Sequence, residues 1–209
     1  MPKDHERDLM LRVWNLAGPH IRAFSKFTSV PDAFWGSLTS LETGAWLRKN
    51  TIVPHRFEPH VQDYLIAIKL GTKREYGGIT AKHLFNATET DIKKYASSWG
   101  LTQVLGYHCL RWGVPVERLE QPELHYQLAA RLLAEFCEHF DLDQRMDHEQ
   151  LLRAWNTGSP SKRKLPDGRE VETTHDPEYV NNGLRRMELW REMEDSYVKQ
   201  KNQEEKART

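Results

Sequence analysis

Residues 123–140 read ELHYQLAARLLAEFCEHF, and this stretch decides the fold class. Leu124, Leu128, Leu132 and Phe136 recur every four residues, the spacing of one face of an α-helix. Further segments with helical spacing are 8–17, 32–44, 88–95, 148–155 and a last helix that begins near Pro177. Only 51–58, TIVPHRFE, has the β-branched and aromatic content of a short extended segment. We predict a mainly α fold, of the α+β kind, with a minor β element.

Glycine, proline and threonine mark where these segments begin and end. Gly18-Pro19 is expected to end the first helix, and Gly44 to end the helix that Pro31-Asp32 opens. Thr88 or Thr90 is a plausible N-cap for the helix over 88–95. Residues 71–78, GTKREYGG, are expected to form a loop, as is the long polar stretch after Trp155. We assign 1–29 to an N-terminal helical segment, 30–190 to the main domain and 191–209 to a charged helix end or a disordered tail.

Composition limits the classes of function. The chain has 209 residues, with 30 Lys and Arg and 30 Asp and Glu, so its formal net charge is zero. A dedicated nucleic-acid or membrane-surface binder would carry a basic excess. We therefore expect no nucleic-acid partner, and no apolar run is long enough for membrane insertion. His55 and His60 are the closest histidine pair, but no three-ligand set accompanies them, so we expect no metal and no cofactor.

Residues 95–106, YASSWGLTQVLG, combine polar and apolar positions in an unusual way. Ser-Ser-Trp-Gly and Thr-Gln stand between apolar residues, which suits neither a core helix nor a plain loop. Such stretches often line a groove that holds a polar ligand against an apolar floor. We expect Trp99 to offer a flat apolar face there, with Gly100 and Gly106 allowing close approach of the backbone.

Five motifs follow one another in a definite order. They are SLETG (40–44), PHRFEPH (54–60), SSWGLTQVLG (97–106), LRAWNTG (152–158) and DPEYV (176–180). In this order they resemble the lysozyme-like glycosidases that cut peptidoglycan, a group that includes soluble lytic transglycosylases and phage-type N-acetylmuramidases. The resemblance spans roughly residues 30–190 and implies a lysozyme-like catalytic domain with a groove. It also implies a hydrolase type of enzyme acting in cell wall degradation, with peptidoglycan or a related amino-sugar polymer as its partner.

The resemblance assigns roles residue by residue. Glu42 aligns with the catalytic acid, and Glu58, in the Phe-Glu-x-His motif, is the candidate for a second catalytic carboxylate. The expected substrate-binding residues are Trp99, Gln103, Trp155, Asn156 and Tyr179. Three positions depart from the family pattern: Thr43 replaces Ser, Thr102 replaces Met and Trp155 replaces Tyr.

The chemistry of these residues fits the same reaction. A glycosidic oxygen leaves readily only if it is protonated, which requires a carboxylic acid. Glu42 follows the apolar residues Leu38 and Leu41, which favour a protonated carboxyl, and the Tyr179 hydroxyl or the Trp155 N–H is expected to orient it. The amides of Asn156 and Gln103 match sugar hydroxyl and N-acetyl groups.

Several alternatives stay open. The muramyl C6 hydroxyl or water can attack, which gives either a 1,6-anhydro product or a hydrolysed one. A degenerate lysozyme-like protein that binds glycan without turnover is a second hypothesis, and a chitinase or chitosanase variant is a third. Because the N-terminus, MPKDHERDLM, lacks an apolar signal segment, we expect synthesis in the cytoplasm. Action on the cell wall would then follow release or delivery, as for a phage endolysin, a virion-borne lysin or an injected effector, or export by another route.

Overall fold

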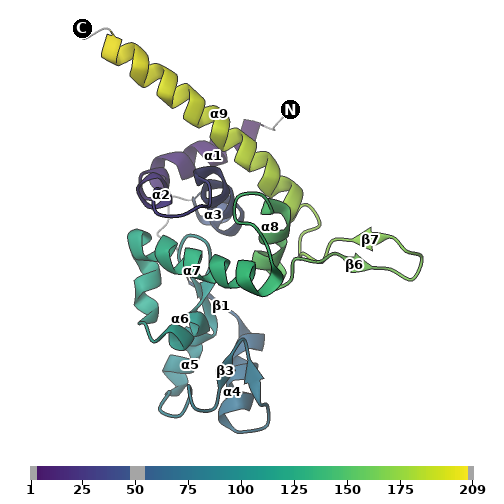
Figure 1. The fold of residues 1–209 in the computed structure, drawn as a ribbon. Helices are drawn as coiled ribbons and strands as arrows, with labels where there is room; N and C mark the ends of the chain where they lie inside the picture. The colour runs from purple at the N-terminus through teal and green to yellow at the C-terminus, as the bar shows by residue number, and fades with distance from the viewer. Residues whose placement is uncertain (1–3, 48–54, 207–209) are drawn as a thin grey trace. The chain divides into compact units, whose positions relative to one another are not determined.

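The computed structural model describes residues 4–47 and 55–206 of the chain. It is mainly helical, with a few short strands, which confirms the predicted fold class (Figure 1). The chain divides into two compact units, which we call the first unit (residues 1–48 and 133–209) and the second unit (residues 49–132). Residues 51–54 of the predicted extended segment 51–58 lie outside the described residues.

The first unit is built around one central helix. Its elements are α1 (Asp4–Leu16), α2 (Gly18–Ser25), α3 (Asp32–Leu47), the end of α7 (Pro122–Phe140), α8 (His148–Thr157), β6 (Arg163–Lys164), β7 (Glu170–Val171) and α9 (Tyr179–Lys206). Helix α3 packs against α1, α2 and α9, and α8 packs against α9. The strands β6 and β7 form an antiparallel hairpin that extends from the helices (Figure 1). Buried side chains from these helices include Met10, Val13, Phe34, Trp35, Leu38, Leu151, Leu152, Met187 and Trp190.

Two helix boundaries in the first unit differ from the prediction. Gly18-Pro19 follows α1, as expected, but it also begins α2, because proline is well suited to the first turn of a helix. The prediction that Gly44 ends the second helix is wrong, since α3 continues to Leu47. A Cβ atom at position 44 would lie 3.2 Å from the Leu9 side chain. Gly44 therefore allows α1 to lie close against α3.

The second unit combines a small sheet with short helices. Its elements are β1 (Arg56–Phe57), α4 (Pro59–Lys69), β2 (Glu75–Tyr76), β3 (Ile79–Thr80), α5 (Glu89–Tyr95), β4 (Ser97–Trp99), β5 (Val104–Leu105), α6 (Gly106–Trp112), the 3-10 helix η1 (Val116–Glu120) and the start of α7. The sheet has the strand order β1-β4-β5 and is antiparallel throughout. The hydrophobic core of the second unit consists of Val61, Leu65, Ile68, Ile79, Leu84, Ile92, Ala96 and Tyr107.

Other local predictions have mixed outcomes. Thr88 caps α5 and forms a capping box with Asp91, which confirms the predicted start of that helix. The loop predicted for 71–78 is only partly confirmed, because Glu75–Tyr76 form β2, which pairs with β3 just after the predicted loop. The turn residues Gly77 and Gly78 have φ angles of 56° and 79°, a conformation that glycine adopts at low cost. Helix α9 continues without interruption to Lys206.

The closest contact between α3 and α9 yields a stability test. A Cβ atom at Gly36 would lie 2.1 Å from the indole ring of Trp190, which is fully buried. We expect Gly36→Ala to lower the free energy of unfolding by about 1–3 kcal/mol, because the indole cannot move without displacing α9. Urea unfolding followed by circular dichroism measures the change.

Gly44→Ala is the matched control in the same helix. Its new methyl group would meet only the flexible end of Leu9. The higher helix propensity of alanine offsets that crowding, so the change should stay within about 1 kcal/mol. Equal losses in both variants would contradict the assigned role of Gly36.

Candidate active site and its supporting residues

Glu42 and Tyr179 form the central contact of the candidate site in the first unit. The Tyr179 hydroxyl donates a hydrogen bond to Glu42 Oε1, and the two residues are 137 positions apart in the sequence. Glu42 is half-buried on α3, and Tyr179 is buried at the start of α9. The tyrosine hydroxyl is one of the two groups that were expected to orient Glu42.

The surroundings of Tyr179 keep its hydroxyl protonated. Burial raises the pKa of Tyr179 well above its usual value, and the neighbouring Glu42 raises it further. The positive charge of Arg186 acts in the opposite direction but does not outweigh these effects. At neutral pH Tyr179 is therefore a hydrogen-bond donor that adds no charge beside the Glu42 carboxyl.

A partly buried ion cluster supports this end of α9. Arg186 Nε donates to Glu6 Oε1 at 3.0 Å, and Arg186 Nη1 donates to Ser40 Oγ at 3.3 Å. Arg185 donates to both carboxylate oxygens of Glu6, at 2.7 and 2.9 Å. Burial alone would raise the pKa of Glu6, but the two arginines outweigh it and lower that pKa. The cluster joins α1 and α9 to α3 two residues before Glu42.

Sequence reasoning missed this cluster, although a signal for Glu6 was present. Glu6 lies on the same face of α1 as Leu9, Met10 and Val13, all of which are buried. A charged residue on an apolar stripe needs a partner, because an unpaired buried charge is costly. The segment 1–29, which was predicted to stand apart from the main domain, therefore supplies a residue that holds α9 in place.

Thr43 shows what the departure from serine at this position does. Its hydroxyl donates to the Thr39 carbonyl at 2.6 Å, within the same helix. Thr43 is fully buried, so this bond satisfies a hydroxyl that has no access to water. Its role is to stabilise α3 beside Glu42.

The two predicted residues on α8 lie beside the loop that leads to Tyr179. Asn156 Oδ1 accepts a hydrogen bond from the His175 backbone N–H at 3.2 Å. Trp155 is half-buried and packs edge-on against Phe136, with ring centroids 6.4 Å apart. Asn156 thus fastens the loop four residues before Tyr179.

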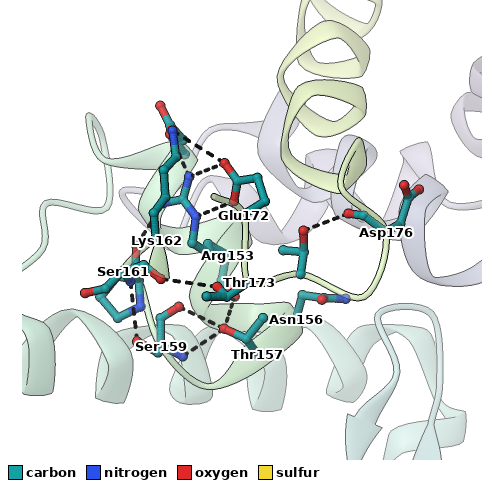
Figure 2. A network of polar contacts seen from close by, with 12 residues as sticks. Arg153, Asn156, Thr157, Ser159, Ser161, Lys162, Glu172, Thr173 and Asp176 are labelled. Atoms are coloured by element: carbon teal, nitrogen blue, oxygen red, sulfur yellow. Dashed lines mark hydrogen bonds and ion pairs between the residues drawn. The ribbon is translucent and has the colours of Figure 1, made fainter. Parts of the chain in front are cut away.

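A network around Arg153 holds the base of the β6–β7 hairpin on α8 (Figure 2). Arg153 is 3% exposed and donates to both carboxylate oxygens of Glu172, at 2.7 and 3.0 Å. It also donates to Glu149 and to the Pro160 carbonyl, and Lys162 pairs with both glutamates. The guanidinium of Arg153 lowers the pKa of each glutamate. The polar stretch after Trp155, which was predicted to be a loop, therefore contains the β6–β7 hairpin, and the Arg153 network anchors this hairpin to α8.

Glu58 lies in the second unit, immediately before α4. Its Oε1 accepts from Arg56 Nε at 2.6 Å, and its backbone N–H donates to the Ala96 carbonyl. The Glu58 side chain is 19% exposed, so the ion pair is only partly shielded from water. This contact places a carboxylate at the edge of the sheet formed by β1, β4 and β5.

The other two predicted residues of the second unit are engaged within the chain. Trp99 is 6% exposed, stacks on His55 with centroids 4.5 Å apart and donates its Nε1–H to the Lys94 carbonyl. Gln103 accepts from Ser98 through Oε1 and donates to the Gly100 carbonyl through Nε2, both at 2.9 Å. Gln103 has a φ of 56°, in the left-handed region that is unfavourable for residues other than glycine. The two hydrogen bonds of its side-chain amide stabilise the tight connection between β4 and β5 in this conformation.

The close backbone approaches expected at Gly100 and Gly106 are made to the chain itself. A Cβ atom at Gly100 would lie 2.2 Å from His125 Nδ1, and one at Gly106 would lie 2.4 Å from the Lys94 carbonyl oxygen. His125 is fully buried, and its Nε2 accepts from the Thr102 backbone N–H at 2.9 Å. Sequence reasoning missed His125, which supports the loop that contains Gln103.

The structure thus brings Glu42 and Tyr179 together in the first unit. It gathers Glu58, Trp99 and Gln103 around one sheet in the second unit. The substrate-binding roles of Trp99, Gln103, Trp155 and Asn156 stay predictions. Within residues 4–47 and 55–206, no group of three or more His, Cys, Asp and Glu side chains is arranged to hold a metal ion. No helix in those ranges has the length and apolar character needed to cross a membrane.

Comparison of the chain with protein-family models, with curated proteins and with solved structures found no match. The site is therefore interpreted from its own geometry and from the resemblance of its motifs.

The buried histidines of the second unit predict a loss of stability in acid. Burial lowers the pKa of His125 to about 3, and burial together with Arg111 lowers that of His108 to about 3. Because the unfolded chain binds these protons near the ordinary pKa of 6.5, stability is complete above that pH and falls below it. Each histidine contributes a slope of up to about 1.4 kcal/mol per pH unit. Urea unfolding at a series of pH values measures it.

His125→Gln removes one titrating group and should make this slope shallower. His139→Gln, which changes an exposed side chain on α7, should keep the wild-type slope. A slope that is the same in His125→Gln and in the wild type would show that His125 is not the group that takes up the proton.

Proposed function

We propose that this protein is a glycosidase that cleaves the β-1,4 bond between N-acetylmuramic acid and N-acetylglucosamine in peptidoglycan. Glu42 is the general acid and base. The observation that supports this most strongly is the hydrogen bond from Tyr179 to Glu42. Two residues that were chosen from separate motifs, near opposite ends of the chain, meet side chain to side chain in the first unit.

The contact suits a group that must give up and regain a proton. A tyrosine hydroxyl with a raised pKa fixes the orientation of the carboxyl group without adding positive charge. A cationic donor in its place would favour the ionised carboxylate and so oppose proton donation. Glu42 protonates the glycosidic oxygen as the bond to the muramyl C1 breaks. As a carboxylate it then accepts the proton of the attacking hydroxyl group.

The attacking group determines the product. Attack by the muramyl C6 hydroxyl gives a 1,6-anhydro sugar and requires one carboxyl group. Attack by water gives a reducing end and usually uses a second carboxylate. Glu58 is the residue that the motif resemblance assigns to that carboxylate. Mass spectrometry of the digested muropeptides distinguishes the products, because the anhydro form lacks one water.

Binding of glycan without turnover is the second candidate function. The amide of Gln103 and the indole N–H of Trp99 are both engaged within the chain, which favours a scaffold role for that sheet over a catalytic groove. A wild-type protein that sediments with purified peptidoglycan but releases no fragments would support this alternative. A chitinase or chitosanase variant would instead release reducing ends from chitin or chitosan oligomers.

Two substitutions test the role of the Tyr179–Glu42 pair. We expect Glu42→Gln to reduce the rate of release of soluble muropeptides by about 100- to 10,000-fold, because the amide cannot donate the proton. Tyr179→Phe keeps the buried ring but removes the hydroxyl, so kcat should fall by about 10- to 100-fold with little change in KM. Turbidity loss of purified peptidoglycan and quantification of muropeptides measure both effects.

Glu178→Gln is the matched control, since it makes the same chemical change at an exposed residue next to Tyr179. It should retain wild-type activity. Equal activity of Glu42→Gln and the wild type would remove Glu42 from the mechanism.

A further inference from the structure

A hollow lies in the second unit, in the segment between β3 and the end of α5. Its volume is about 450 Å³. None of its lining residues belongs to the motifs that define the candidate active site. They are Lys82, His83, Phe85, Asn86, Ala87, Asp91 and Tyr95.

The segment that carries these side chains is firmly held. Leu84 is fully buried in the core of the second unit, next to Phe85. The backbone N–H of Ala87 donates to the Leu84 carbonyl at 3.1 Å, and Lys69 Nζ donates to the Ala87 carbonyl. The Thr80 backbone N–H donates to His83 Nδ1 at 3.1 Å. Phe85 is therefore displayed on a fixed support, and its exposure is a property of the fold.

Three of the lining side chains have no partner within the described residues. Phe85 is 81% exposed and makes no aromatic contact there. Lys82 forms no ion pair with any described residue, and the Asn86 amide forms no hydrogen bond with any of them; both side chains are exposed. Trp99 and Gln103, in contrast, use their polar atoms inside the chain. Side chains with unused bonding capacity around a hollow are the ones available to a ligand.

The charged side chains that line the hollow are those of Lys82 and Asp91. The Asp91 carboxylate caps α5 by accepting from the Thr88 backbone N–H at 2.9 Å and from its hydroxyl at 2.7 Å. Lys82 is left as the cation without a partner in the described part of the chain. An aromatic face packs against the C–H side of a sugar ring, an amide pairs with an N-acetyl group and an ammonium pairs with a carboxylate.

We propose that this hollow binds a carboxylate-bearing N-acetylated amino sugar of the peptidoglycan strand, with Phe85 under the ring, Asn86 at the N-acetyl group and Lys82 at the carboxylate. Muramic acid residues of the proposed substrate carry such a free carboxylate where no stem peptide is attached to them, so this inference rests on the proposed function. The site holds the protein on the polymer independently of the chemistry at Glu42.

Binding to peptide-free glycan strands tests the site. All variants carry Glu42→Gln, so that the polymer is not degraded, and calorimetry gives the affinity. We expect Phe85→Ala to weaken binding about 10-fold, because it removes the aromatic face. The control is Phe27→Ala, which removes a phenylalanine that is 86% exposed in the first unit and should leave affinity unchanged.

Lys82→Gln tests the recognition of the carboxylate. The reference protein should bind muramic-acid-containing strands more tightly than chitin oligomers of equal length, and Lys82→Gln should lose that preference. Isolated stem peptides, which also carry carboxylates, should not compete. Competition by those peptides, equal affinity of Phe85→Ala and the reference, or no binding of glycan strands by the reference would each overturn the site.

The two proposals fail in different ways. Normal binding by Phe85→Ala, together with muropeptide release by the wild-type protein, removes the second site and leaves the glycosidase intact. Binding that depends on Phe85, without any muropeptide release, removes the glycosidase and leaves the site.

Discussion

The packing of α9 on α3 determines where Glu42 and Tyr179 meet. Trp190 lies over Gly36, and the Ser37 hydroxyl donates to the Gly183 carbonyl at 2.6 Å. A Cβ atom at position 183 would lie 2.6 Å from the Leu152 side chain and 3.2 Å from the Leu41 side chain, so glycine allows close packing there as well. With α9 held at these points, Tyr179 projects from its first turn toward the carboxyl of Glu42. A hydrogen bond between residues so far apart in sequence persists only if both helices are fixed more firmly than the bond itself.

The ion cluster at Glu6 supports the same geometry further along α9. Arg185 and Arg186 are successive residues, and Glu6 binds both, so the rotation of α9 about its axis is fixed at this level. Arg186 lies seven residues after Tyr179, which is two helical turns and therefore the same face. Its charge reaches Tyr179, and its pairing with Glu6 prevents an uncompensated cation near that tyrosine. The N-terminal helix is thus part of the structure that determines the electrostatics of the candidate site.

The sequence predicted the elements that have strong periodicity and failed where the outcome depends on tertiary contacts. The helices over Pro122–Phe140 and His148–Thr157 and the cap at Thr88 follow from local spacing and side-chain chemistry, and all three are confirmed. Gly44 was interpreted as a helix end because its actual role, contact with α1, involves a residue 35 positions earlier. The β2–β3 hairpin was missed because its strands have two residues each, too few to show an alternating pattern. Glu6 and His125 were missed because single sequences show which residues are polar but not which of them share a buried environment.

Hydrogen-bonding capacity separates the residues that build this protein from those that are available to a ligand. Gln103 and Asn156 were chosen because amides recognise sugars. The oxygen and the nitrogen of the Gln103 amide, however, both form hydrogen bonds within the β4–β5 connection. The Asn156 amide oxygen accepts a hydrogen bond from the His175 backbone N–H. An amide that is already bonded in a buried site can bind a sugar only by giving up an internal bond, which offsets most of the gain. Phe85, which is exposed, and Lys82, which has no ion pair within residues 4–47 and 55–206, have no such cost. Motif order therefore selected two residues, Glu42 and Tyr179, that the fold brings into contact. Residues with unused bonding capacity emerge only from the polar contacts of the described chain.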